Sequence, residues 1–346
     1  MNPAERVIRR LDGVQQRHVV PAFVVGVIKK FGDDNAGSLV SNLAHSAFGT
    51  VFPLLLFLVT VLGMVLGSNR GLRTQVLHSA VNQFPIVGND LAGNIRSLHR
   101  HSTLGLSIGL LGLIWGSVGL AQAGIFAMEQ IWNLPGPDRP NYPKRMLRAV
   151  LFLSVLGVGT LVTTFLTAAA PASGRGAADV AGAAAVSAIT NSVQFLLVFR
   201  ILTPAAVQWR KLVVGALAAG LGWTVLQEFG TLIVEHYLRH DSALYGLFAI
   251  VMGLFTWIYF LAELTVYCAE INVVLDRRLW PRAIVQPPLT EADRMSMAAQ
   301  AQQNQRRPEQ HVEVTFDGRA QLQDEYLRGP SDPEGDDPED RRESAR

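Results

Sequence analysis

Long apolar segments separated by short polar stretches dominate the chain as far as Trp280. A helix needs about 20 apolar residues to cross the hydrocarbon core of a bilayer, which is about 30 Å thick. Six segments reach that length, and we expect each to form a transmembrane helix. They are Leu43–Leu66, Leu104–Met128, Met146–Ala170, Val180–Ile201, Leu212–Val234 and Ser242–Leu275. The pattern predicts an all-α, polytopic membrane protein with six transmembrane helices.

Two stretches beside these spans have the pattern of amphipathic helices. In residues 1–38, basic residues such as Arg6 and Arg10 alternate with apolar residues such as Val7. Residues 72–98, between the first two spans, are similarly mixed. An apolar side flanked by basic side chains favours a helix that lies in the headgroup region of a membrane. For residues 1–38, a solvated N-terminal arm is the alternative.

The composition changes abruptly after Trp280. Residues 281–346 begin with prolines and a glutamine-rich stretch and continue to an acidic stretch, Ser331–Asp340. A segment of this kind has too little apolar surface to build a core of its own. We therefore predict three parts: an N-terminal juxtamembrane segment (1–38), a transmembrane domain (39–280) and a disordered acidic cytoplasmic tail (281–346).

The overall composition agrees with a membrane protein. Hydrophobic residues make up 49% and charged residues 17% of the chain, and the mean hydropathy is +0.24, which is high for a soluble protein with charged ends. The net charge is only +2, and basic residues are scattered beside the spans, which argues against a nucleic-acid-binding surface. We expect both termini to lie in the cytoplasm, because this orientation places most of these basic residues on the cytoplasmic side of the membrane. Cys268 is the only cysteine, and we predict neither a metal nor a cofactor.

Acidic residues inside the predicted spans are the first candidates for function. An ionisable group at the middle of a membrane costs about 2.5–3.5 kcal/mol on insertion scales, so it needs partners or a wet cavity. Glu228 is nearest the middle of a span and is the leading candidate. The last span carries polar residues at steps of three and four, which fall on one side of a helix. They are Thr256, Tyr259, Glu263, Tyr267 and Glu270.

The spacing of these acids suggests a polar seam between the last two spans. Glu263 and Glu270 are seven residues apart, and Glu228 and Glu235 repeat that spacing in the fifth span. As a hypothesis, the two helices face each other across a seam that binds a lipid headgroup or relays protons. The alternative is that these acids make structural hydrogen bonds to neighbouring helices.

The second span contains a series of small residues at alternating steps of four and three: Gly105, Gly109, Gly112, Gly116 and Gly119. Such a series forms a groove in which another helix backbone can approach closely. A mobile interface and static tight packing are both open as interpretations. Pro53, near the middle of the first span, is correspondingly either a hinge or a static kink.

Several short motifs occur in an order that is similar to a known family. They include Phe52-Pro53-Leu54, Ala243-Leu244-Tyr245-Gly246, Trp257-Ile258-Tyr259 and Ala269-Glu270-Ile271-Asn272. Through these motifs, the chain from about residue 20 to residue 280 resembles the YihY/BrkB family of bacterial envelope membrane proteins, once labelled ribonuclease BN. Tyr245 and Gly246 are taken from the match as packing or hinge positions.

The resemblance implies a multi-pass protein of the bacterial inner membrane that is tied to envelope integrity. We expect a transporter or flippase of a lipid or lipid-linked envelope precursor, with membrane lipids or lipid-linked glycans as partners and envelope-biogenesis proteins as further candidates. A non-catalytic membrane scaffold is the alternative. Enzyme activity is not expected, because a two-metal nuclease needs clustered metal ligands and the only close histidine pair, His99 and His101, has no acidic companions.

Overall fold

A computed structural model describes residues 3–65, 102–169, 177–205, 207–237 and 246–316. All regular secondary structure in these ranges is helical, so the predicted all-α class is confirmed for the described part of the chain. The amphipathic stretch expected at residues 72–98 lies outside the described residues.

Long helices form the main body of the described chain, and each overlaps one of the predicted spans. They are α3 (Ala36–Val65), α6 (Ser102–Ile131), α7 (Tyr142–Ala169), α8 (Ala177–Leu202), α9 (Val213–Tyr237) and α10 (Gly246–Arg277). Three of them contain a stretch long and apolar enough to cross a membrane, as judged on the described residues: Ser107–Ile131, Ala185–Leu202 and Val251–Arg277. A multi-pass membrane protein is therefore supported, and the number of six spans stays a prediction.

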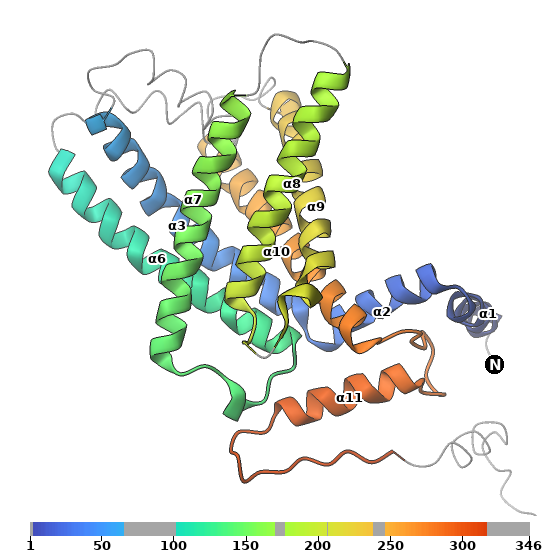
Figure 1. Cartoon of the computed structure of the whole chain (residues 1–346). Helices are drawn as coiled ribbons and strands as arrows, with labels where there is room; N and C mark the ends of the chain where they lie inside the picture. The colour runs from blue at the N-terminus through green and yellow to red at the C-terminus, as the bar shows by residue number, and fades with distance from the viewer. Residues whose placement is uncertain (1–2, 66–101, 170–176, 206, 238–245, 317–346) are drawn as a thin grey trace, which may run out of the picture.

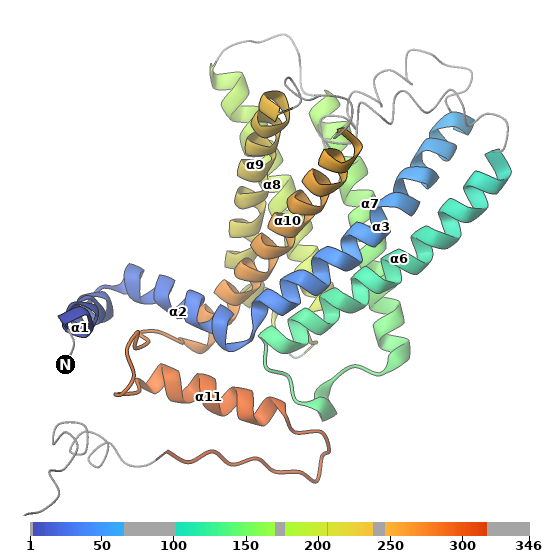
Figure 2. The same cartoon turned by 180° about the vertical axis from the view of Figure 1, so that it is seen from behind.

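The long helices form two sets that lean apart (Figures 1 and 2). The helices α3 and α6 run side by side at an oblique angle and make the most extensive contact among the described helices. The helices α7, α8 and α9 stand more upright, with α8 packed between its two neighbours in sequence. Helix α10 contacts both α3 and α9 and so joins the two sets.

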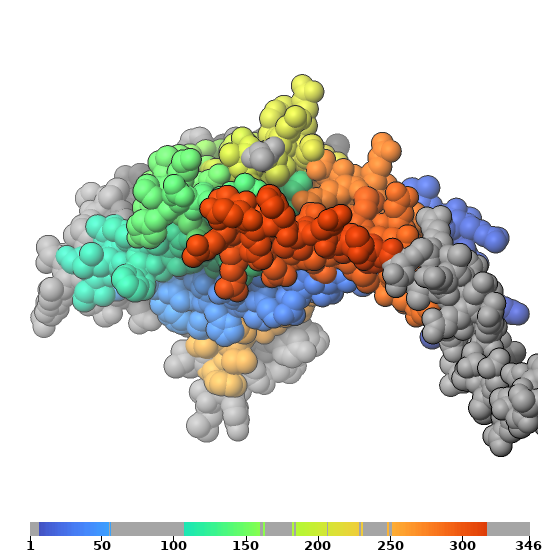
Figure 3. All heavy atoms as spheres, turned by 90° about the horizontal axis from the view of Figure 1, so that it is seen from below, coloured from blue at the N-terminus to red at the C-terminus, as the bar shows by residue number. Residues whose placement is uncertain are grey.

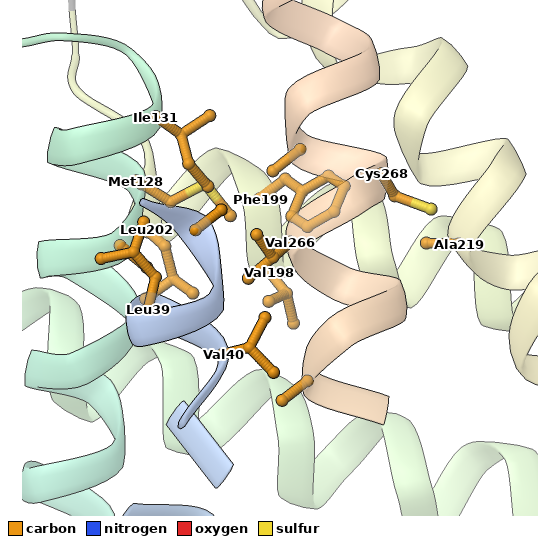
Figure 4. Close-up of a cluster of buried hydrophobic side chains, with 14 of the residues drawn as sticks. Leu39, Val40, Met128, Ile131, Val198, Phe199, Leu202, Ala219, Val266 and Cys268 are labelled. Atoms are coloured by element: carbon orange, nitrogen blue, oxygen red, sulfur yellow. The ribbon is translucent and has the colours of Figure 1, made fainter. Parts of the chain in front are cut away.

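A core of buried apolar side chains connects the two sets (Figure 4). Val40 of α3, Met128 of α6, Phe199 of α8 and Val266 of α10 all contribute to this cluster and are nearly inaccessible to solvent. Burial of this apolar surface, at about 25 cal/mol per Å², holds the helices together at the end of the bundle where α6 and α8 terminate. We call this end the base of the bundle.

The base of the bundle is covered by chain from both ends of the sequence. It includes α1 (Pro3–Arg17), α2 (Val19–Asp33), the 3₁₀ turns η2 (Gly136–Asp138) and η3 (Trp209–Leu212), and α11 (Glu291–Gln303). Helix α1 leaves apolar side chains such as Val7 and Leu11 more than half exposed, as a helix at a membrane surface requires.

Residues 281–316 differ from the disordered tail that composition suggests. Seen from below, they lie across the underside of the helices as a continuous band (Figure 3). Helix α11 in this segment begins with a capping box, in which Thr290 and Asp293 each hydrogen-bond to the other's backbone N–H. We call residues 281–316 the docked segment. Composition missed it because its stability comes from polar contacts with other parts of the chain.

Candidate functional site

Glu270 is an acidic side chain sealed inside the protein near the end of α10. Its side chain is 0% exposed, as is that of Lys30 in α2. The Lys30 Nζ lies 3.6 Å from Glu270 Oε2 and pairs more closely with Asp34, one helical turn further along at the corner between α2 and α3. We call Lys30, Asp34 and Glu270 the Glu270 cluster.

Glu270 is the least satisfied member of this cluster. Lys30 Nζ also donates a hydrogen bond of 3.0 Å to the Ile131 carbonyl. Lys30 and Asp34 both approach the Glu270 carboxyl group, but neither of its oxygens has a hydrogen bond of normal geometry among the described residues. Asp34 adds a second carboxyl group close enough to interact with Glu270. A buried polar atom without a partner costs about 1–3 kcal/mol, and more when it is charged. Glu270 therefore has free capacity to bind a proton or a donor group.

Asp34 connects the cluster to three other elements. Its Oδ1 accepts hydrogen bonds from Asn133 Nδ2, after α6, at 3.2 Å and from Gln300 Nε2 of α11 at 3.3 Å. Arg277, the last residue of α10, donates to the Trp132 carbonyl at 2.6 Å and interacts electrostatically with Asp34. The cluster thus lies where α2, α6, α10 and α11 meet, at the base of the bundle.

Local features of α2 aim Lys30 at Glu270. Phe31 stacks on Tyr267 with ring centroids 4.1 Å apart, and Gly26 allows the backbone of α2 to approach closely, since a Cβ there would lie 2.9 Å from the Leu279 carbonyl. Asn35, with φ of 51°, provides the left-handed turn between α2 and α3, a conformation that asparagine tolerates. Helix α2 is thereby held across the end of α10.

The structure separates the members of the predicted polar stripe on α10. Tyr267 and Glu270 contact α2, whereas Thr256 is exposed and its hydroxyl only donates to the Met252 carbonyl at 2.8 Å. Tyr259 and Glu263 are half-buried between these ends, and Tyr259 packs against the apolar core. The stripe therefore runs from an exposed middle to a sealed end.

Helices α9 and α10 pack through a different side of α10 from the polar stripe. Three glycines of α9 lie against that side: Gly215 against Asn272, Gly222 against Leu264 and Gly230 against Trp257. The Gly215 N–H also donates to Asn272 Oδ1 at 2.7 Å. The predicted acidic seam between α9 and α10 is therefore not found at Glu270. Glu270 faces α2, and small residues of α9 make the contact with α10. The side chain of Glu228 lies outside the described residues, so its role stays a prediction.

The small-residue groove of α6 holds α3 over part of its length. A Cβ on Gly112 would lie 3.0 Å from Pro53, and one on Gly116 would lie 3.0 Å from the Thr50 Cα. Gly119 is exposed and has nothing within 4 Å of such a Cβ, so the groove does not continue to it. Gly109 is buried. The close approach predicted from sequence is therefore found around Pro53.

Three of the packing positions are placed only in part. The surroundings of Gly105 lie outside the described residues, as does Tyr245, while Gly246 is the first residue of α10. A hinge role for Pro53 and these positions stays a prediction.

Lys30 and Asp34 are site residues that the sequence interpretation missed. Lys30 stands at the end of a short apolar patch, where a lysine is expected to reach toward the membrane surface. The useful signal was the Lys30–Asp34 spacing of four residues, which allows a helical ion pair. Among the described residues, no group of three or more His, Cys, Asp or Glu side chains is arranged to hold a metal ion.

A second buried ionic network fixes the docked segment to the N-terminal helices. Arg282 is 1% exposed; its Nη1 lies 2.6 Å from Asp33 Oδ2 and its Nε 2.8 Å from Asp293 Oδ1. Lys29 Nζ reaches Asp293 Oδ1 at 3.2 Å. In α1, Asp12 Oδ1 accepts a 3.0 Å hydrogen bond from the Ile284 N–H. The two ends of the sequence therefore hold each other at the base.

The pKa values of Asp12 and Asp293 predict that this docking is sensitive to acid. Burial raises each pKa, but hydrogen bonds outweigh it: from Ile284 and Gln15 to Asp12, and from Ala283 and Thr290 to Asp293, so both values fall below 3.8. A lowered folded-state pKa gives stability that is complete above about 3.8 and is lost as pH falls through the folded-state values. The docked segment should loosen only below about pH 4.

A spin label would report this loosening. The label is placed by Met297→Cys on α11 in a Cys268→Ala background, and its mobility is followed from pH 7 to pH 3. The same label at exposed Ser154 of α7 should keep its mobility, which excludes general unfolding. A label on α11 that becomes mobile well above pH 4, or not at all, contradicts the role of the two carboxylates.

Comparison with known proteins gives the chain a family. The family model described as "Virulence factor BrkB" matches residues 27–289, a range that includes the whole Glu270 cluster. The chain is 22% identical over 289 residues to "Inner membrane protein YhjD" of Escherichia coli (strain K12), which covers 77% of this chain and 84% of the relative. It is 24% identical over 260 residues to an uncharacterized protein of Dickeya dadantii (strain 3937), covering 69% and 79%. No solved structure matches the chain significantly. Because the family match spans most of the sequence and the described helices are apolar, the chain belongs to the BrkB family and is a multi-pass membrane protein.

Proposed function

We propose that this protein is a transporter or flippase that moves a lipid or lipid-linked envelope precursor across the bacterial inner membrane. The relative named as an inner membrane protein supports that location. We further propose six spans with both termini in the cytoplasm, since the basic residues beside the long helices are most numerous on that side. No chemical conversion of the lipid is part of the proposal.

The observation that carries this proposal is the state of Glu270. A carboxyl group that is 0% exposed at the end of an apolar helix is expensive to maintain, and ion pairing with Lys30 at 3.6 Å offsets only part of that cost. A purely structural acid normally has its oxygens fully hydrogen-bonded. Lys30 and Asp34 lie against the Glu270 carboxyl group, but neither of its oxygens has a hydrogen bond of normal geometry from the described residues, which suits a group that binds a headgroup donor or takes up a proton.

The contact between α3 and α6 supplies a candidate route for movement. Gly112 and Gly116 bring these helices together at Pro53, where a proline removes one backbone hydrogen bond from α3. Rocking of the α3–α6 pair against α8 and α9 would change access to the base, where the Glu270 cluster lies. Proton coupling through Glu270 is the energy source we propose.

The test is lipid flipping by purified protein in liposomes. We expect Glu270→Gln, which removes the charge and nearly keeps the shape, to reduce flipping of fluorescent anionic lipids at least about tenfold, as for loss of one hydrogen-bonded charge. Glu228→Gln and Glu263→Gln, measured beside it, decide whether the site extends along α9 and α10. The matched control is Glu309→Gln, an exposed acid of the docked segment.

Two results would remove the proposal. One is flipping by the wild type that does not exceed that of empty liposomes, with and without a proton gradient. The other is flipping by Glu270→Gln equal to wild type, in a protein that elutes as a single folded species. A proton-coupled role further requires that wild-type flipping change with the imposed pH gradient.

A membrane scaffold is the second candidate, because the docked segment lies across the underside of the helices (Figure 3) and α1 keeps exposed apolar side chains. This function predicts that deletion of residues 281–346 abolishes the cellular phenotype while Glu270→Gln has no effect on it. The transporter predicts that Glu270→Gln abolishes the phenotype.

A further inference from the structure

Four arginines gather where α6, α7 and α8 meet at the base, apart from the Glu270 cluster. Arg139 follows η2, Arg145 and Arg148 lie in the first turns of α7, and Arg200 lies in the last turn of α8. We call these four residues the arginine cluster. Arg139, Arg145 and Arg148 share Glu129 as a neighbour, which lies in the last turn of α6 and is 1% exposed, and Arg200 lies next to Arg148.

The arginine cluster carries more positive charge than its partner balances. Arg145 Nη2 lies 3.5 Å and Arg139 Nε 3.9 Å from Glu129 Oε2. Arg148 is attracted by Glu129 and repelled by Arg200. Within the described part of the chain, Glu129 is the acidic residue that forms ion pairs with the cluster. Like charges in a partly buried setting repel strongly, so a bound anion would stabilise this arrangement.

Hydrogen bonding in the cluster is incomplete as well. Arg139 Nε, Arg145 Nε and Arg148 Nη1 are buried atoms with no acceptor among the described residues. A buried donor without an acceptor costs free energy, particularly when it is charged. A phosphate that entered the cluster would supply the acceptor that these three N–H groups lack.

Arg200 connects the cluster to a cavity of about 380 Å³ between α8 and η3. The cavity is largely open to solvent and is also lined by Gln208, Trp209 and Arg210. The Arg210 guanidinium lies 5.8 Å from the centre of the Trp209 ring, and Trp209 is 53% exposed. An exposed tryptophan beside arginines is typical of the membrane–water interface.

We propose that the arginine cluster and this cavity bind the phosphate group of an anionic amphiphile at the membrane surface. Arginine presents a planar fork of donors that matches two phosphate oxygens at once, and several such forks converge here. Trp209 offers an apolar ring to the part of the ligand next to its phosphate. This site is separate from Glu270, so it stands whether or not the protein transports lipid.

Binding is measured by native mass spectrometry of the full chain in a phosphate-free, non-ionic detergent. Phosphatidylglycerol is titrated as the anionic lipid, phosphatidylcholine as the lipid without net charge, and glycerol phosphate as a soluble competitor. The variants are Arg148→Gln and Arg200→Gln. The control is Arg278→Gln, which removes the same charge at an exposed position after α10.

We expect each cluster variant to weaken phosphatidylglycerol binding about tenfold or more, and the Arg278→Gln variant to bind as wild type. Displacement by glycerol phosphate would show that the phosphate alone is recognised, and resistance to it would show that the lipid is the source; both support the site. Arg200 is exposed, so Arg200→Gln should fold even where Arg148→Gln does not, and Arg200→Lys should bind with intermediate strength. Equal binding of both lipids by the wild type, or unchanged binding by a folded Arg200→Gln variant, overturns the proposal.

Discussion

Replacing Arg282 by alanine should release the docked segment from the base of the bundle. The guanidinium is 1% exposed and is shared by Asp33 and Asp293, so its loss leaves the fully buried Asp293 carboxylate with only Lys29, at 3.2 Å, as a cation. Breaking one side of a buried ion pair costs about 3–5 kcal/mol, and the remaining lysine places this case near the lower end. A loss of about 3 kcal/mol corresponds to opening about a hundred times more often.

Amide hydrogen exchange in lipid nanodiscs measures this release. Exchange in α11 should accelerate about a hundredfold in Arg282→Ala, while exchange in α3 and α10 stays as in wild type. The control is Lys211→Ala, which breaks a surface pair with Asp276 at 2.8 Å and should cost less than about 1 kcal/mol. If α11 exchanges at the wild-type rate in Arg282→Ala, the buried network is not what holds the segment.

Release of the docked segment has a consequence for the Glu270 cluster. Gln300 of α11 hydrogen-bonds to Asp34, and Gln303 hydrogen-bonds to Gln130 and Asn133 beside it. Without α11, water would reach Asp34 from the base and weaken the electrostatic coupling among Lys30, Asp34 and Glu270. In the proposed transporter, the docked segment thus controls how much water reaches the Glu270 cluster from the cytoplasmic side.

The second large effect is expected in the α3–α6 contact. Gly116→Leu places a side chain where its Cβ alone would lie 3.0 Å from the Thr50 Cα, so the two helices must separate. Overpacking of this kind costs about 1–3 kcal/mol, and in a membrane it removes the close approach that small residues provide. We expect a clear loss of thermal stability for the detergent-solubilised protein. Size-exclusion chromatography of heated samples measures this loss.

Gly119→Leu is the matched control, because Gly119 lies on the same helix and a Cβ at this position would have nothing within 4 Å. Both changes gain the same helix propensity, about 1 kcal/mol relative to glycine, so the difference between them isolates the contact with α3. Gly119→Leu should be as stable as wild type or slightly more so. Equal melting of the two variants would mean that α3 and α6 do not pack closely at Thr50.

Several features of this protein could be predicted from the local sequence pattern alone. The length of the apolar segments predicts the long helices, because a helix makes its own backbone hydrogen bonds and about 20 apolar residues match the thickness of the bilayer core. The spacing of Gly112 and Gly116 correctly indicates a close helix contact, since residues four apart share a helix face. Glu270 stands out as a candidate because an acid within an apolar helix is costly wherever it points.

The partners of these residues were decided by tertiary structure. Glu270 and Glu263 are equivalent in a helical repeat, yet the first is sealed against Lys30 and the second is half-buried, because α2 crosses only the end of α10. Gly119 continues the small-residue series and lies almost on the same face as Gly112, yet it is exposed and has nothing within 4 Å of a Cβ, because the position of the neighbouring chain decides which part of that face is covered.

The docked segment shows the limit of composition most clearly. Its residues bury little apolar surface, so composition predicts disorder. It is ordered because Arg282, Asp293 and Gln300 pair with Asp33, Lys29 and Asp34, in α2 or at its end, at the opposite end of the sequence. Sequence determined which residues need to be buried in an apolar phase, whereas only the folded chain determined which polar groups meet, because long-range pairing leaves no local periodicity.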